Sequence, residues 1–115
     1  MNYLYPLIAS TRKLNIAIIL NGISTKKKTF YQTILPALQK EFSVEVFETK
    51  SPTHAIKLAG EAAINQFDIV LAAGGDGTLN QVLNGLLSVT GPLPVLGVIP
   101  LGSGNDFAAL MNVRP

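Results

Sequence analysis

The sequence predicts a single α/β domain in which a parallel sheet lies between two layers of helices, as in Rossmann-like folds. Short apolar runs alternate with segments whose apolar residues repeat at helical spacing, in the order βαβαβαβ. The runs at 14–20 and 69–73 are nearly continuous, which is typical of strands covered on both faces. Polar loops with glycine follow three of the four predicted strands, at the edge where open α/β sheets bind their ligands.

Composition limits the function classes that fit this chain. With 115 residues, 48% of them hydrophobic, it can form one core but not two independent domains. A net charge of +2 does not indicate nucleic-acid binding, so no nucleic-acid partner is expected. The absence of cysteine excludes disulfides and thiol chemistry and favours a cytoplasmic location. Residues 1–12 are expected to form a loose N-terminal arm, because their apolar patch is too short to span a bilayer.

The first strand is predicted over residues 14–20, and a polar turn, 21–25, follows it. An ordinary Asn-Gly turn is the alternative to a ligand-binding loop here. The next segment has apolar residues at intervals of four, and Pro36 predicts that its helix is kinked or starts late. Three lysines, 26–28, precede this helix; such runs are usually solvated, although a nearby polyanion site would benefit from their field.

The second strand is predicted over residues 43–48, and Thr49 follows it. Ser51 has the chemistry of an N-cap and Pro52 that of a first helical residue, so a helix with an alanine-rich buried stripe is expected to begin there. His54 is the only histidine and has no second ligand-type residue near it in the sequence. We therefore expect it to be a surface residue with no chemical role.

The third strand, predicted over residues 68–73, leads into the glycine turn 74–78. Glycine permits positive φ, and without a Cβ a ligand can approach the backbone N–H groups closely. A helix beginning near Thr78 would direct its unpaired N–H groups and the positive end of its dipole to the same point, which predicts phosphate binding. Asp76 lies within this electropositive turn, which predicts a role with a metal ion or a proton. A plain tight turn is the alternative.

The fourth strand is predicted over residues 94–99, followed by a second glycine loop, 100–106, and a short helix, 107–111. If the strands are ordered 2-1-3-4, the loops after strands one, three and four are neighbours and form one pocket. Two common phosphate signatures are absent. The sequence has no G-x-x-x-x-G-K-[ST], and its glycine turn departs from G-x-G-x-x-G and follows the third strand rather than the first.

Two motifs resemble a known family. Ala-Gly-Gly-Asp-Gly-Thr-Leu-Asn-Gln-Val-Leu-Asn-Gly-Leu at 73–86 and Pro-Leu-Gly-Ser-Gly-Asn-Asp-Phe-Ala at 100–108 are similar to motifs of the diacylglycerol kinase catalytic domain family of bacterial lipid kinases, which includes sphingosine and ceramide kinases. NAD kinases and phosphofructokinases share the G-G-D-G turn, and the expected fold is like a phosphofructokinase N-terminal domain. The second motif points to the lipid kinases. The resemblance implies ATP-dependent phosphorylation of a lipid hydroxyl, with Mg²⁺.

The resemblance also implies a set of site residues. Those expected to bind the cofactor are Asn21, Gly22, Ser24, Thr25, Thr49, Gly74, Gly75, Asp76, Gly77, Thr78, Asn80, Gln81, Gly102, Ser103 and Asn105. Asp76 is the catalytic candidate, either orienting the metal ion or accepting the proton of the lipid hydroxyl. No further metal-ligating residue is assigned.

The chain departs from the family pattern at three points. Asn-Gly-Ile-Ser-Thr stands where Asn-Pro-x-Ser-Gly is frequent, and Gln81 stands where Glu is frequent. Family members also continue into a second, mainly β domain that is expected to hold the lipid site. Residues 13–115 are thus expected to be an ATP-binding N-terminal domain without turnover in isolation. A NAD-kinase-like domain and a non-catalytic nucleotide-binding module remain alternatives, and expected partners include the inner membrane face, contacted peripherally, and a second copy in a homodimer.

Overall fold

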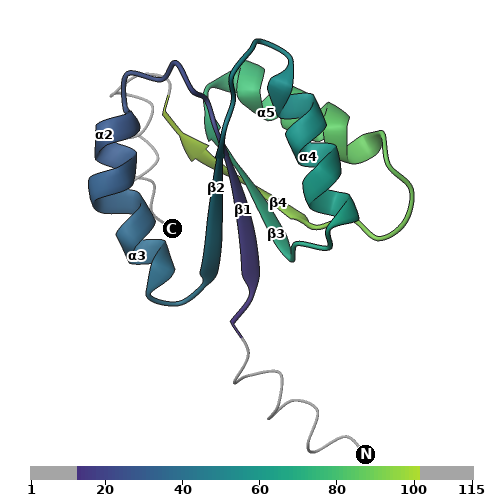
Figure 1. Cartoon of the computed structure of the whole chain (residues 1–115), viewed down its shortest axis with the longest axis horizontal. Helices are drawn as coiled ribbons and strands as arrows, with labels where there is room; N and C mark the ends of the chain where they lie inside the picture. The colour runs from purple at the N-terminus through teal and green to yellow at the C-terminus, as the bar shows by residue number, and fades with distance from the viewer. Residues whose placement is uncertain (1–12, 102–115) are drawn as a thin grey trace, which may run out of the picture.

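The computed structural model describes residues 13–101. Four parallel strands in this part of the chain form one sheet in the order β2-β1-β3-β4 (Figure 1). The strands are β1 (Asn15–Leu20), β2 (Ser43–Glu48), β3 (Ile69–Gly74) and β4 (Val95–Pro100). This arrangement confirms the predicted parallel α/β fold. The predicted N-terminal arm, the final helix and residues 102–106 of the second glycine loop lie outside the described residues; Pro100, predicted as the first residue of that loop, is the last residue of β4.

The central strand β1 sets the register of the sheet. It pairs with β2 from Asn15 opposite Ser43 to Leu20 opposite Glu48, and Leu20 is also level with Ala73 of β3. Residues 16–20 of β1 are at most 2% exposed, which explains why this strand lacks the apolar-polar alternation of a half-buried strand. Because the three strands end at the same level, the loops that follow them lie side by side.

Helices cover both faces of the sheet (Figure 1). On one face lie α4 (His54–Ile64) and α5 (Asp76–Leu87), which pack with the sheet residues Ala17, Ile19 and Val70. A Cβ at Gly85 of α5 would lie 2.9 Å from the Cβ of Ala59 in α4 and would overlap the carbonyl oxygen of Ile56. Small residues therefore allow the two helices to approach closely.

The other face is covered by a helical segment in three parts: α2 (Lys27–Thr29), the π-helical turn η1 (Phe30–Ile34) and α3 (Leu35–Gln39). Phe30 is fully buried and anchors this segment against Ile16 and Ile18. The disturbance predicted at Pro36 is the π-helical turn, in which the N–H of Leu35 bonds to the carbonyl of Phe30. A new α-helix then begins at Leu35, so that Pro36 lies in its first turn, where an N–H is not needed.

The start of α4 differs from the prediction. The helix begins at His54, and residues 51–53 form a turn in which the carbonyl of Ser51 accepts a hydrogen bond from the N–H of His54. Thr53 is the N-cap residue and makes no side-chain cap bond, so the assignment of Ser51 as N-cap was wrong. The Nδ1 atom of His54 instead accepts a hydrogen bond from the N–H of Lys50 at 3.0 Å, which gives this histidine a local structural contact.

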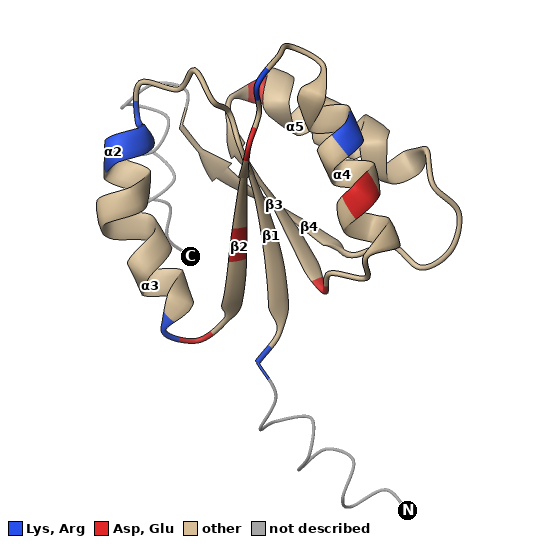
Figure 2. Ribbon diagram, in the orientation of Figure 1, with Lys and Arg blue, Asp and Glu red and all other residues tan. Residues whose placement is uncertain are grey.

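Charged residues are spread over the helices, the loops and strand β2 rather than gathered at one place (Figure 2). Within the described residues, none of the helices is both long enough and apolar enough to cross a bilayer.

Candidate functional site

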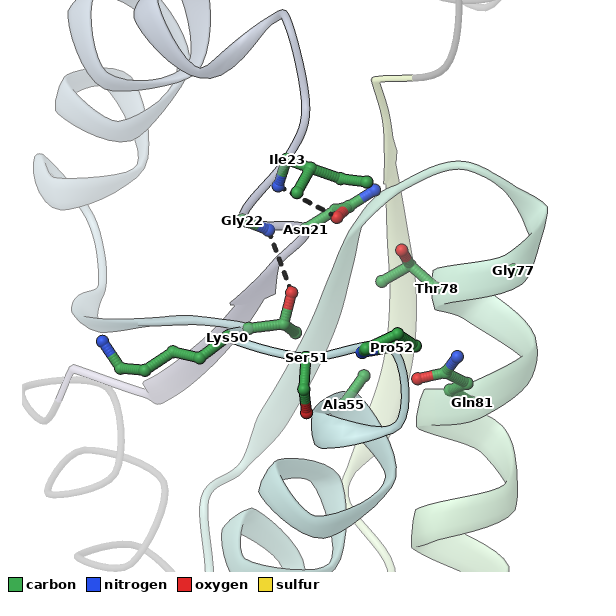
Figure 3. A pocket seen from close by; sticks show the side chains of 11 residues that line it. Asn21, Gly22, Ile23, Lys50, Ser51, Pro52, Ala55, Gly77, Thr78 and Gln81 are labelled. Atoms are coloured by element: carbon green, nitrogen blue, oxygen red, sulfur yellow. Dashed lines mark hydrogen bonds between the residues drawn. The ribbon is translucent and has the colours of Figure 1, made fainter.

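A cavity of about 580 Å³ opens at the carboxyl edge of the sheet (Figure 3). The loop after β1, the segment after β2 and the first turns of α5 enclose it. Its lining consists of Asn21, Gly22, Ile23, Thr49, Lys50, Ser51, Pro52, Ala55, Gly77, Thr78 and Gln81. Its size is in the range of cavities that hold ligands of nucleotide size.

Gly22 connects the loop after β1 to the segment after β2, and both line the cavity. Its N–H donates a hydrogen bond to the Oγ1 atom of Thr49 at 2.9 Å, drawn as a dashed line in Figure 3. A Cβ at position 22 would overlap the carbonyl oxygen of Thr49, so only glycine allows this approach. The Oδ1 atom of Asn21 accepts a hydrogen bond from the N–H of Ile23 at 3.2 Å, and the N–H of Asn21 donates to the carbonyl of Ala73 at 2.8 Å. These bonds tie the loop after β1 to both neighbouring strands.

The residues of the glycine turn do not have the positive φ values that the sequence predicted. Gly75 is the N-cap of α5 with an extended backbone (φ −98°, ψ −163°), and Gly91 is the only glycine with positive φ among residues 13–101. Strand β3 therefore passes directly into α5. Gly74 is required for packing, because a Cβ there would lie 2.6 Å from Oγ1 of Thr78 and 3.1 Å from Cβ of Asn21.

Gly75 and Gly77 differ from Gly74, since a Cβ at either position would meet nothing within 4 Å. The first hydrogen bond of α5 runs from the N–H of Leu79 to the carbonyl of Gly75 at 3.2 Å. The N–H groups of residues 76–78 have no acceptor among the described residues. Two glycines thus leave open space beside the free N–H groups and positive end of a helix, which is an arrangement that suits an anion.

Comparison with known proteins identifies the family. Residues 15–115 match the family model described as diacylglycerol kinase catalytic domain. The chain belongs to this family. This match confirms the resemblance that the two sequence motifs indicated. The named relatives confirm that the family is one of lipid kinases.

Its relatives in the diacylglycerol kinase family are longer. The chain is 40% identical over 102 residues to the protein named "Diacylglycerol kinase" of Bacillus subtilis, covering 83% of this chain and 32% of that protein. It is 34% identical over 97 residues to "Probable lipid kinase YegS" of Escherichia coli, covering 84% of this chain and 32% of that protein. The chain therefore spans about a third of the length of the curated relatives it matches.

Solved structures give the same assignment. A diacylglycerol kinase from Bacillus anthracis str. Sterne superposes with a TM-score of 0.71 and 30% identity, over 87% of this chain and 37% of that one. An iron-containing alcohol dehydrogenase superposes with a TM-score of 0.58 at 16% identity, over 81% of this chain and 31% of that one, which shows a shared fold alone.

The structure brings together only part of the residue set expected of a diacylglycerol kinase domain. Six of the predicted residues line the cavity: Asn21, Gly22, Thr49, Gly77, Thr78 and Gln81. Six others are described but do not line it: Ser24, Thr25, Gly74, Gly75, Asp76 and Asn80. Among these, Ser24 shapes its own loop by accepting a hydrogen bond from the N–H of Lys26 at 3.0 Å. Gly102, Ser103 and Asn105 lie outside the described residues.

Asp76 is the first residue of α5, next to the cavity residue Gly77, and it is exposed. Among the residues that the structure describes, no three His, Cys, Asp or Glu side chains come together as a metal site.

The predicted residue set lacks five of the residues that line the cavity: Ile23, Lys50, Ser51, Pro52 and Ala55. Ser51 and Pro52 were interpreted as the start of a helix, because their residue types fit a cap and a first helical position. The signal that could have found them is their place directly after β2, since ligands of parallel sheets lie beyond the carboxyl ends of the strands.

Proposed function

We propose that residues 13–115 form the ATP-binding N-terminal domain of a longer lipid kinase, which transfers the γ-phosphate of ATP to a lipid hydroxyl. The observation that carries the proposal is the start of α5, where free N–H groups and the open space at Gly75 and Gly77 adjoin the cavity. Family membership supports the reaction class, because the named relatives are diacylglycerol and lipid kinases.

The polar part of the cavity suits the phosphates. The N–H groups of Gly77 and Thr78 and the hydroxyl of Thr78 can donate hydrogen bonds to phosphate oxygens without adding charge. Lys50 also lines the cavity, but its side chain extends away from Thr78 and Gln81 in Figure 3. Phosphoryl transfer depends on positioning and charge neutralisation more than on covalent chemistry, so a rigid set of donors is what the reaction requires of this domain.

The apolar residues of the lining suit a nucleoside. Ile23, Pro52 and Ala55 are apolar and line the same cavity. A flat base can bury its faces against such side chains, while the phosphates reach the helix start. The combination of an apolar surface with a phosphate-binding helix end favours a nucleotide over inorganic phosphate alone.

Mg²⁺ fits this donor set as a cation shared with the nucleotide. It is commonly held by one or two carboxylates together with substrate phosphates and water, so the single carboxylate of Asp76 is sufficient as the contribution of this segment. When bound, the metal ion neutralises charge on the phosphate oxygens. Asp76 either orients that ion or accepts the proton of the lipid hydroxyl, and the two roles predict different responses to Asp76→Asn.

Amide NMR of the 115-residue chain tests the nucleotide site. Mg-ATP is expected to shift the signals of Gly22, Gly75, Gly77 and Thr78, while adenosine should shift mainly Ile23 and its neighbours. A second cavity, at the opposite edge and lined by Gln66 and Pro92 among others, serves as the internal comparison. Shifts confined to that cavity, or an unchanged spectrum at millimolar Mg-ATP, would reject the proposal.

A chimera tests the reaction. The matching third of the Bacillus subtilis diacylglycerol kinase, to which this chain is 40% identical, can be replaced by residues 15–101. The chimera is expected to transfer phosphate from ATP to diacylglycerol. A folded chimera that transfers no phosphate from ATP to diacylglycerol would contradict the proposal.

A further inference from the structure

Three side chains outside the cavity form a connected group that we call the Lys27 network: Lys27, Tyr31 and Glu48. The Nζ atom of Lys27 lies 2.8 Å from Oε1 of Glu48, and the hydroxyl of Tyr31 donates a hydrogen bond to Oε2 of the same carboxylate. Both oxygens of Glu48 are therefore engaged. The network connects α2 and η1 on one face of the sheet to the last residue of β2.

The Lys27 network also reaches the cavity wall. The Nζ atom of Lys27 donates a second hydrogen bond to the carbonyl oxygen of Gly22, at 3.2 Å. The N–H of Gly22 is held by Thr49. Gly22 is thus fixed at both of its backbone polar groups, by Thr49 directly and by Glu48 through Lys27. Glu48 and Thr49 are consecutive, so the end of β2 determines where this residue lies.

We propose that Lys27, Glu48 and Tyr31 are positioning residues that hold Gly22 in the wall of the nucleotide cavity without contacting the nucleotide. The inference rests on the proposed function and adds a role for residues that do not line the cavity. Restraining the Gly22 backbone in the free protein reduces the ordering that nucleotide binding would otherwise require.

The alternative is an ordinary surface ion pair. Such a pair contributes little to stability, and the side chains of Lys27 and Glu48 are 36% and 33% exposed. The pair of Lys57 and Glu61 on α4 fits that description, with 4.0 Å between Nζ and Oε2 and side chains 72% and 52% exposed. The Lys27 network differs because it includes a backbone carbonyl of the cavity wall and a tyrosine hydroxyl.

The packing of the helical segment fixes the position of Tyr31. Tyr31 lies in η1, the π-helical turn that precedes Pro36. Its ring meets the ring of buried Phe30 edge-on, with centroids 5.1 Å apart. Phe30 fixes the turn in the core, and the next residue reaches Glu48. Figure 2 shows the basic start of the same helical segment at α2, where Lys27 lies.

The test measures amide hydrogen exchange in the loop after β1 and the affinity for Mg-ATP separately, in the 115-residue chain. Lys27→Met and Glu48→Gln are expected to speed amide hydrogen exchange at Gly22 and Ile23 by about tenfold and to weaken Mg-ATP binding by about fivefold to tenfold, as for the loss of one hydrogen bond. Tyr31→Phe should have a smaller effect in the same direction. Lys27→Arg keeps a cationic donor and should restore most of the affinity.

Lys57→Met and Glu61→Gln are the matched controls, because they remove the same charges from the exposed pair on α4. Neither should change exchange at Gly22 or the affinity for Mg-ATP. If Lys27 bound phosphate directly, Glu48→Gln would release it and strengthen Mg-ATP binding, and that outcome overturns the inference. Unchanged exchange at Gly22 in Lys27→Met also overturns it. If the wild-type chain binds no Mg-ATP, the proposed function fails, whereas the exchange measurement still tests the network.

Discussion

Gly22 and Thr49, 27 residues apart in the chain, are joined by a 2.9 Å hydrogen bond from the N–H of one to the Oγ1 of the other. The pairing of β1 with β2 makes the contact possible, because it places Leu20 opposite Glu48 at the carboxyl edge. The absence of a side chain at Gly22 then lets the two loops touch. One wall of the cavity is therefore built from two segments that have no local relationship in the sequence.

Thr49→Val tests this contact, since valine keeps the shape of threonine and removes the acceptor. The N–H of Gly22 then lies partly buried without its partner, and we expect a loss of about 1 kcal/mol in unfolding free energy, with weaker Mg-ATP binding. Denaturant unfolding and nucleotide titration provide the measurement. Thr49→Ser keeps the hydroxyl and should behave like the wild type. Equal losses in both variants would show that the methyl group, rather than the hydrogen bond, matters.

Gly77→Ala should affect ligand binding without reducing stability. A Cβ at Gly77 meets no protein atom, and alanine favours helix more than glycine by about 1 kcal/mol, so the variant should be as stable as the wild type or more stable. It should nevertheless bind Mg-ATP at least about tenfold more weakly, because the new methyl group occupies the space beside the helix start. Calorimetry and titration of the same samples would show both effects. Undiminished binding would mean that phosphate does not approach Gly77.

Gly85→Ala is the counterpart in the same helix, where alanine should harm the fold. The added Cβ would overlap the carbonyl oxygen of Ile56 and press against Ala59 of α4. Overpacking of this kind costs about 1–3 kcal/mol, so the thermal midpoint should fall. Gly85 does not line the cavity, and at temperatures where the variant is folded its affinity for Mg-ATP should be unchanged. A stable Gly85→Ala variant would show that the two helices can separate at little cost.

Asp76→Asn addresses the chemical step. In the chimera with the Bacillus subtilis relative, we expect the rate of lipid phosphorylation to fall by about 10²-fold or more, as for the loss of a catalytic proton acceptor or charge. The exposed side chain should contribute only about 0.3–1 kcal/mol to stability through the helix dipole. A higher Mg²⁺ requirement would assign Asp76 to the metal ion. An unchanged Mg²⁺ requirement with an altered pH profile would assign it to the proton. Full activity would remove Asp76 from the mechanism.

The pKa values of the Lys27 network predict its response to alkali. Partial burial, and then the hydrogen bond and negative charge of Glu48, raise the pKa of Tyr31 from 10.0 to about 12. A raised pKa means that the stabilisation is present in full below pH 10 and is lost as the pH rises through about 12. Ultraviolet titration should show one late-ionising tyrosine that disappears in Tyr31→Phe. Glu48→Gln should lower the pKa of Tyr31, and an unchanged value would show that Glu48 does not affect it.

The same network predicts a response to acid. The hydrogen bond from Lys27 and then that from Tyr31 lower the pKa of Glu48 below its ordinary value of 4.5, with smaller contributions from the charges of Lys27 and Lys50. Its stabilisation is therefore present above pH 4.5 and is lost as the pH falls through the lowered pKa. Amide exchange at Gly22 should accelerate over that acid range in the wild type. If Glu48→Gln shows the same acceleration, another group is responsible.

The sequence alone determined the features that depend on neighbouring residues. Apolar residues located the four strands to within about one residue at each end. In β1 the apolar pattern is continuous because both faces are buried, whereas β2 alternates apolar and polar residues and has no buried residue. The glycine turn and the motif at 100–108 were sufficient to indicate the family. Pro36 indicated a disturbed helix, since a missing N–H changes the structure locally.

Only the tertiary structure decided which glycines are required for packing, which ones lie beside open space, and which side chains are in contact. Gly74 is confined by Thr78 and Asn21, whereas Gly75 and Gly77 face open space, a distinction that depends on atoms contributed by other segments. Gly22 and Thr49, which are in contact, are 27 positions apart in the sequence, and Lys27 and Glu48 are 21 positions apart. Such contacts follow from the order and register of parallel strands, and these are set by packing across the whole sheet rather than by any local pattern.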